Sequence, residues 1–325
     1  MKITIKNTGG LKRAREIIGK LASLLSLILM AVILSALSPY FLTVDNIFNI
    51  GLQMAVIAIM AIGEMMVIIS AGIDLSVGSV LALSGITSTL MLVNGMGIFL
   101  SVLFGVLTGT LCGFINGVLI SFGRIPPFIA TLGMMGIARG LALIITGGIP
   151  IFGLPDTFSF LGGGRILNVI PFPVVIVVIL ALIGHFILAY TRFGRYTYAV
   201  GSNIEAARLS GVNIKKYLTM IYTFGGILCG FAGVILASRL STGQPTAGTG
   251  WELDVIAACV IGGASFSGGE GNVGGAMLGA MIMGVLRNGC NLLNISNFWQ
   301  QVFIGTIIIF AVFIDQYRKH KMGEV

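Results

Sequence analysis

The stretch that most constrains the fold runs from residue 51 to residue 93 and carries only two charged side chains, Glu64 and Asp74. As one continuous helix it would be roughly 65 Å long, about two crossings of a ~30 Å hydrocarbon core. Soluble chains carry about 25% charged residues, whereas this one carries 9%. We therefore predict an all-α, polytopic membrane protein.

The segment AGIDLSVGS, residues 71–79, is where this stretch is expected to break. Gly72 permits a turn, and Asp74 and Ser76 carry side chains that can cap the helix that resumes. Two interpretations remain open. One is a tight turn at the membrane surface, and the other is a discontinuous helix whose broken end faces a substrate path.

Acidic side chains inside the apolar segments need partners or water. An ionised Glu64 would cost on the order of 3 kcal/mol at its depth in the span. Arg139 lies at a comparable depth in its own span if the two spans are antiparallel, so we hypothesise an ion pair between them. A proton or substrate site is the functional alternative for Glu64. Glu252 and Asp254 precede a later glycine-broken segment, where they could line an entrance.

The apolar segments together predict about ten transmembrane helices, some of them broken or re-entrant. Small residues repeat every four positions in one segment, which gives a smooth face for close helix packing. These residues are Gly105, Gly109, Gly113 and Gly117. The segment 255–267 is too short to cross easily, and the glycine-rich stretch 262–275 that overlaps its end is expected to be re-entrant. The expected spans are 21–37, two within 51–93, 97–120, 128–146, 171–190, 217–238, 255–267, 273–293 and 298–315.

Basic residues gather in three separate segments rather than on one nucleic-acid-binding face. They are concentrated in residues 1–20, in the loop 191–216 and in the tail 316–325. Cytoplasmic segments of membrane proteins carry such an excess of Lys and Arg. We therefore expect residues 1–325 to form a single transmembrane domain with both termini and the central loop in the cytoplasm, and no nucleic-acid partner.

The loop 191–216 is expected to contain one short helix. Ser202 and Glu205 have the S-x-x-E spacing of a capping box, and Gly211 can adopt the left-handed conformation that ends a helix. A helix of about two turns is marginal in water. The membrane domain, the lipid surface or a partner protein must therefore hold it.

Catalytic and cofactor motifs have little support in this sequence. Gly269, Gly271 and Gly274 spell G-x-G-x-x-G, but a dinucleotide site needs a preceding strand and a parallel sheet, whereas apolar helices flank these glycines. The sequence has neither a phosphate-binding G-x-x-x-x-G-K-[ST] motif nor a cluster of metal ligands. We therefore expect a chain without a cofactor of its own, and not an enzyme.

Five sequence blocks, in order, resemble one family, the bacterial ABC importer permeases for monosaccharides of the ribose type. The resemblance covers about residues 38–315, and Glu64 departs from the pattern of the family, which has an uncharged residue there. The blocks are SPYFLTVDNIFNI, GIDLSVGSVLALSG, PPFIATLGMMGIARG, GRYTYAVGSNIEAARLSGVNI and QPTAGTGWELDVIAACVIGGASFSGGEGNVGG.

The resemblance implies a multi-pass protein of the bacterial inner membrane, with the ABC importer permease fold and alternating access. It also implies a second permease subunit, either a copy or a paralogue, ATP-binding subunits that hold ATP and Mg, an extracytoplasmic sugar-binding protein, and surrounding lipid. The loop 191–216 would be the coupling loop that contacts the ATPase. The residues implied in that contact are Glu205, Ala206, Ala207, Arg208 and Gly211. The competing hypothesis is a proton-coupled secondary transporter that uses Glu64, Asp74 or Arg139.

Overall fold

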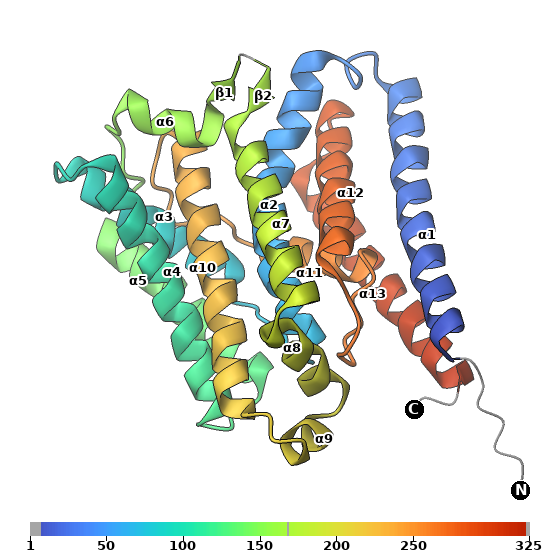
Figure 1. Cartoon of the computed structure of the whole chain (residues 1–325). Coiled ribbons are helices and arrows are strands. Elements are labelled where there is room, and N and C mark those ends of the chain that lie inside the picture. Colours follow the sequence, from blue (N-terminus) through green and yellow to red (C-terminus); the bar gives the residue numbers. More distant parts are fainter. Residues whose placement is uncertain (1–7, 168, 323–325) are drawn as a thin grey trace, which may run out of the picture.

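The computed structural model describes residues 8–167 and 169–322, and helices form most of this part of the chain (Figure 1). The basic termini predicted at 1–20 and 316–325 therefore lie partly outside the described residues, at 1–7 and 323–325. In chain order the elements are α1 (Thr8–Leu37), α2 (Val44–Ile69), α3 (Val77–Val93), α4 (Ile98–Ser121), α5 (Pro127–Thr146), α6 (Asp156–Gly163), β1 (Arg165–Ile166), β2 (Ile170–Pro171), α7 (Phe172–Tyr190), α8 (Arg192–Ser202), α9 (Ile204–Leu209), α10 (Ile214–Leu240), α11 (Trp251–Ile261), α12 (Val273–Leu292) and α13 (Asn297–Met322).

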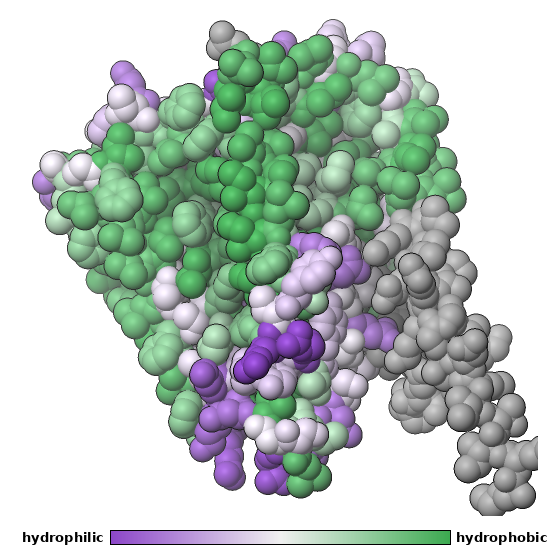
Figure 2. Space-filling view, in the orientation of Figure 1, coloured by the Kyte–Doolittle hydropathy of each residue, from purple (hydrophilic) through white to green (hydrophobic). Residues whose placement is uncertain are grey.

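Six helices within the described residues are long and apolar enough to cross a membrane: α2, α4, α5, α7, α10 and α12. Shorter apolar helices occupy Ser23–Leu37, Val77–Val93 and Asn297–Phe310. An all-α, polytopic fold is thus confirmed. Figure 2 shows a broad hydrophobic band on the visible face, with hydrophilic residues gathered below it over α8 and α9.

Among the six helices long enough to cross a membrane, α2, α10 and α12 are the most buried. In their most apolar windows, 83%, 72% and 67% of the residues are buried, whereas the share is 28% or less in α4, α5 and α7. The last three helices therefore form an outer layer whose apolar side chains face away from the core. A soluble protein could not expose so much apolar surface, but a lipid environment accepts it.

The glycine face of α4 packs against α10, as predicted. A Cβ atom added to Gly113 would lie 2.8 Å from the Cα atom of Gly226, and one added to Gly109 would lie 2.8 Å from that of Gly230. Glycines on both helices therefore face one another. Because the backbones approach so closely, dispersion supplies the attraction that the hydrophobic effect does not provide between helices in lipid.

The predicted break between α2 and α3 is present, but its details differ from expectation. The positive φ that turns the chain belongs to Ala71, at 62°, and not to Gly72. Gly72 is required for space, since a Cβ atom there would meet the hydroxyl of Tyr222. Ser76 precedes α3 without a side-chain capping bond, so the prediction is wrong for Ser76, whereas Asp74 Oδ1 does accept from the Ser76 N–H at 2.8 Å. Asp74 and Ser76 are buried, which favours a discontinuous helix inside the protein over a turn at the surface.

The second broken region lies between α11 and α12. Helix α11 has 11 residues, about 16 Å at 1.5 Å per residue, so it is too short to cross a bilayer, as predicted. It starts at Trp251, four residues before the expected boundary, so Glu252 and Asp254 belong to its first turn. The glycine-rich loop that follows returns to the end of α2, where the Gly269 N–H donates to the Ile69 carbonyl at 2.8 Å.

Candidate functional site

The loop 191–216 contains two helices where the sequence predicted one. Thr191 caps α8 by accepting a hydrogen bond from the Gly194 N–H at 3.3 Å. Asn203 caps α9 by accepting from the Ala206 N–H at 2.9 Å. Because Ser202 is the last residue of α8, the predicted capping box is wrong by one position. Asn is as good an N-cap as Ser, so the Asn203 side chain was the available signal.

The residues implied in coupling lie on α9 and at its end. Glu205 pairs with Arg208 at 2.7 Å, but their side chains are 66% and 64% exposed, so the pair contributes about 0.5 kcal/mol or less to stability. Ala206 is exposed, whereas Ala207 is buried against the rest of the chain. Gly211 ends the turn with φ of +83°, as predicted. Helix α9 therefore presents Glu205, Ala206 and Arg208 outward, while Ala207 anchors it.

Helix α8 is fixed to the membrane domain by close backbone contacts. A Cβ atom on Gly201 would meet the carbonyl oxygen of Ile69 and would lie 2.8 Å from the nitrogen of Gly269. The Tyr198 hydroxyl donates to the Gly271 carbonyl at 2.8 Å. The chain's own membrane domain therefore holds the α8–α9 platform, which we define as residues 192–209.

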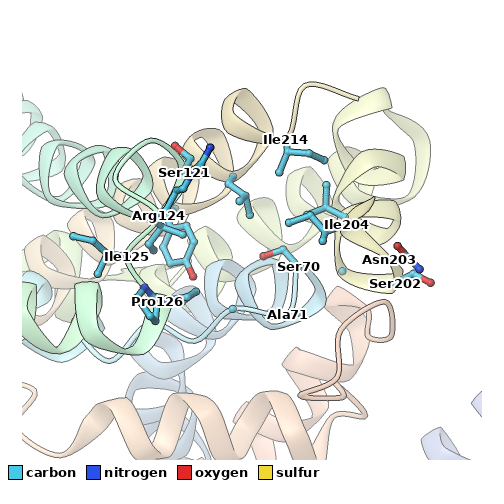
Figure 3. Close-up of a pocket in the computed structure, with 17 residues that line it drawn as sticks. Ser70, Ala71, Ser121, Arg124, Ile125, Pro126, Ser202, Asn203, Ile204 and Ile214 are labelled. Atoms are coloured by element: carbon cyan, nitrogen blue, oxygen red, sulfur yellow. The ribbon is translucent and has the colours of Figure 1, made fainter. Parts of the chain in front are cut away.

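A cavity of about 650 Å³ lies between the platform and the membrane domain (Figure 3). Its walls come from the end of α2, the α4–α5 connection, the α8–α9 junction and the first turns of α10. Polar side chains in the wall include Ser70, Ser121, Arg124, Ser202 and Asn203. The junction between α8 and α9 therefore borders open space.

Three predicted residues, Glu64, Asp74 and Ser76, meet at the break between α2 and α3. The Glu64 carboxylate accepts from the Asp74 N–H at 3.1 Å. Asp74 Oδ1 accepts from the Ser76 N–H at 2.8 Å and from the Ser76 hydroxyl at 2.5 Å. Asn116 of α4, which the sequence analysis did not single out, donates to the Ser76 hydroxyl at 3.0 Å.

Arg139 lies elsewhere, so the hypothesis of an ion pair with Glu64 is wrong. One guanidinium nitrogen donates to the carbonyl of Pro245 at 2.6 Å and to that of Ala247 at 2.8 Å. These carbonyls belong to the connection between α10 and α11. Backbone carbonyl groups therefore accept the hydrogen bonds of the Arg139 guanidinium group. Sequence patterns do not reveal such partners, because every residue carries a carbonyl group.

Substitutions at Glu64 and Arg139 are expected to act independently. Because the two side chains share no partner, the losses of unfolding free energy in Glu64→Gln and Arg139→Gln should add within about 0.5 kcal/mol in the double variant. Thermal melting of the purified variants in detergent measures this. An interaction energy of more than about 1 kcal/mol would show that the two charges are coupled after all.

Asp254 and Glu252 do not form a common entrance. Asp254 is fully buried and forms an ion pair with Arg287 of α12, so the prediction that it lines an entrance is wrong. Glu252 is partly exposed, and a Cβ atom on Gly78 would lie 3.0 Å from its carboxylate. The sequence analysis missed Arg287, although a basic residue inside the predicted span 273–293 was itself a signal that an acidic partner is nearby.

Comparisons with known proteins agree on one family. Residues 46–312 match the family model described as branched-chain amino acid transport system / permease component. The chain is 44% identical over 301 residues to the ribose import permease protein of Escherichia coli K12, covering 91% of this chain and 94% of that protein. It is 44% identical to the ribose import permease protein of Bacillus subtilis 168, over 91% of this chain and 92% of that protein. No solved structure matches.

A further relative is named for a different sugar. The D-allose transport system permease protein of Escherichia coli K12 is 38% identical, over 89% of this chain and 89% of that protein. The similarity thus spans nearly the full length of proteins whose names refer to different monosaccharides.

Proposed function

Because this chain belongs to the family of permease components of branched-chain amino acid transport systems, we propose that it is the membrane-spanning permease subunit of an ATP-driven importer for a monosaccharide. The observation that carries the proposal is the 44% identity to ribose import permeases over nearly the whole chain. The names of these relatives indicate ribose as the substrate, and other pentoses and hexoses are the alternatives. The chain itself is a transport subunit and not an enzyme.

The proposed assembly has two permease subunits, ATP-binding subunits and an extracytoplasmic sugar-binding protein in a bacterial inner membrane. ATP and Mg would bind to the separate ATPase. The chain would cross the membrane about ten times, with both termini and the α8–α9 platform in the cytoplasm. The basic segments 1–20, 191–216 and 316–325 support this orientation.

Helix α9 is the proposed contact with the ATP-binding subunit. It is exposed, it is held by its own cap and by Gly211, and it borders a cavity. Two apolar side chains at its surface, Ile204 and Leu209, are 46% and 80% exposed. Closure of the ATPase would shift α9 and, through α8, the ends of α2 and the glycine-rich loop, which would alternate access to a central path.

Leu209→Asp is expected to weaken association with the ATP-binding subunit about tenfold, equivalent to about 1.4 kcal/mol, because it puts a charge in place of an apolar side chain that is 80% exposed at the proposed contact. Co-purification with the ATPase and its stimulated ATP hydrolysis measure the loss. Leu167→Asp is the matched control, since Leu167 is 88% exposed beside the β1–β2 hairpin at the opposite end of the molecule (Figure 1). Equal retention of the ATPase by both variants would rule out the contact at α9.

The energy source separates the proposal from a proton-coupled secondary transporter. Sugar uptake in cells is expected to survive collapse of the proton gradient and to stop when ATP is depleted. The opposite result would overturn the ATP-driven importer. Arg139 does not lie with Glu64 and Asp74, so an alternative site of this kind would consist of the two acidic residues alone.

A further inference from the structure

Five buried polar side chains surround the break between α2 and α3, and we call them the oxygen cluster: Glu64, Asp74, Ser76, Asn116 and Tyr222. Their exposed fractions are 1%, 4%, 1%, 0% and 0%. They come from α2, from the break, from α4 and from α10. The proposed coupling mechanism uses none of them as a contact with a partner.

Hydrogen bonds join four members of the oxygen cluster into one chain. Glu64 accepts from the backbone of Asp74, the Asp74 carboxylate accepts from Ser76, and the Ser76 hydroxyl accepts from Asn116. Tyr222 adjoins the same turn, because its hydroxyl occupies the space where a Cβ atom of Gly72 would be. The cluster is therefore continuous across three packed helices.

Three oxygen atoms of the cluster have no hydrogen-bond partner among the described residues: Glu64 Oε2, Asn116 Oδ1 and the Tyr222 hydroxyl. Buried polar atoms are normally paired, and each unpaired one is costly. All three can serve as oxygen ligands. The Asn116 amide contacts the cluster through Ser76, so its second polar atom is held beside the same group.

No basic side chain of the described residues pairs with either carboxyl group. The two ion pairs in this part of the chain join Arg208 to Glu205 and Arg287 to Asp254. The titratable groups near the cluster on α4, α10 and α11 are the thiols of Cys112, Cys229 and Cys259, none of which supplies a positive charge. Two buried carboxyl groups therefore lie at the break without a counter-charge from the described residues.

We propose that the oxygen cluster binds one small, hard monovalent cation, Na⁺. Carboxylate, amide and hydroxyl oxygens are the ligands that hard cations prefer. A single positive charge would offset one of the two carboxylate charges and could satisfy the unpaired oxygens. The oxygen cluster adjoins the 650 Å³ cavity beside the α8–α9 platform, because Gly72 and Tyr222 line both.

The bound cation would join α2, α4 and α10 at the point where α2 is broken. It would stabilise the break in one conformation, since the ion binds the folded arrangement of the cluster and not the separated side chains. The inference does not depend on the transported sugar. Its test reads thermal stability and not transport, so its failure and that of the proposed function are distinguishable.

The experiment measures the melting temperature of the full-length chain in detergent while Na⁺ replaces choline at constant ionic strength and pH. If Na⁺ is the ligand, the melting temperature rises by several degrees and saturates. Glu64→Gln abolishes the rise, whereas Asp156→Asn, which changes an exposed carboxylate at the start of α6, retains it. The same titration on Asn116→Ala tests a ligand without a titratable group and is expected to show a reduced response.

The second arm varies pH at constant Na⁺. If protons alone neutralise the carboxyl groups, the melting temperature does not respond to Na⁺ but rises as the pH falls, and Glu64→Gln removes that response; this result would overturn the cation site. If Glu64→Gln fails to fold, infrared difference spectra of the unmodified chain report the carboxyl bands on addition of Na⁺ or acid. Responses to Na⁺ and pH that are absent, or identical in the variants, would overturn the proposal and leave bound water as the partner of the oxygens.

Discussion

Replacing Arg287 with methionine is expected to destabilise the chain by about 3 kcal/mol or more, the typical cost of leaving one member of a buried ion pair without its partner. The Asp254 side chain is fully buried and that of Arg287 is 24% exposed. Methionine has a similar length and apolar stem, so the loss reports the missing charge and not a missing volume. A lower melting temperature in detergent, with a corresponding loss of folded yield, measures the effect.

Neutralising both partners is the control for this prediction. The double variant Asp254→Asn with Arg287→Met no longer buries a charge, so it should recover most of the stability that Arg287→Met loses. Lys216→Met, at an exposed position near the start of α10, should be close to neutral. A melting temperature of Arg287→Met equal to that of the unmodified chain would show that solvent already screens Asp254.

The long helices were predictable because each expresses a repeated local pattern. The expected spans 97–120, 128–146, 171–190 and 273–293 differ from α4, α5, α7 and α12 by one residue at each end at most. The length of an apolar segment and the glycine repeat of α4 are patterns that extend along a whole helix. Many residues therefore indicate the same helix, and an atypical residue at one position does not change the prediction.

The partners of single charged residues were not predictable in the same way. Arg139 was assigned to the nearest acidic residue by depth, yet it donates to two backbone carbonyls. Asp254 was interpreted without Arg287, although both lie in apolar segments. Depth in a span specifies one coordinate only, whereas a pair also requires the rotation of each helix and its neighbours, which tertiary packing determines.

The ends of short helices fall between these two cases. Residues 191–216 were correctly expected to contain a capped helix that Gly211 ends, but α8 was missed and the cap of α9 is Asn203 instead of Ser202. Two adjacent residues with equal capping ability leave the choice to the fold. Gly201 packs closely against Ile69 near the end of α8. This contact keeps Ser202 in α8 and leaves Asn203 as the N-cap of α9.

The contact between α4 and α10 yields the other large expected effect. Gly113→Val should lower the free energy of unfolding by about 3 kcal/mol or more, since the new Cβ atom would lie 2.8 Å from the Cα atom of Gly226. Backbone atoms cannot move aside locally to relieve so close a contact. Helix α4 would have to move away from α10 along much of its length. Loss of a monodisperse peak in size-exclusion chromatography and a lower melting temperature measure this.

Gly133→Val on α5 is the matched control, because it makes the same substitution in another apolar helix. A Cβ atom on Gly133 meets nothing within 4 Å, so no backbone contact opposes it, and its effect should stay within about 1 kcal/mol of the unmodified chain. The comparison removes the general effect of valine on helix formation. If both variants melt alike, close packing of α4 on α10 is not what holds the outer layer to the core. If only Gly113→Val unfolds, backbone proximity between these two helices is the determinant, because helix type, residue size and lipid environment are shared.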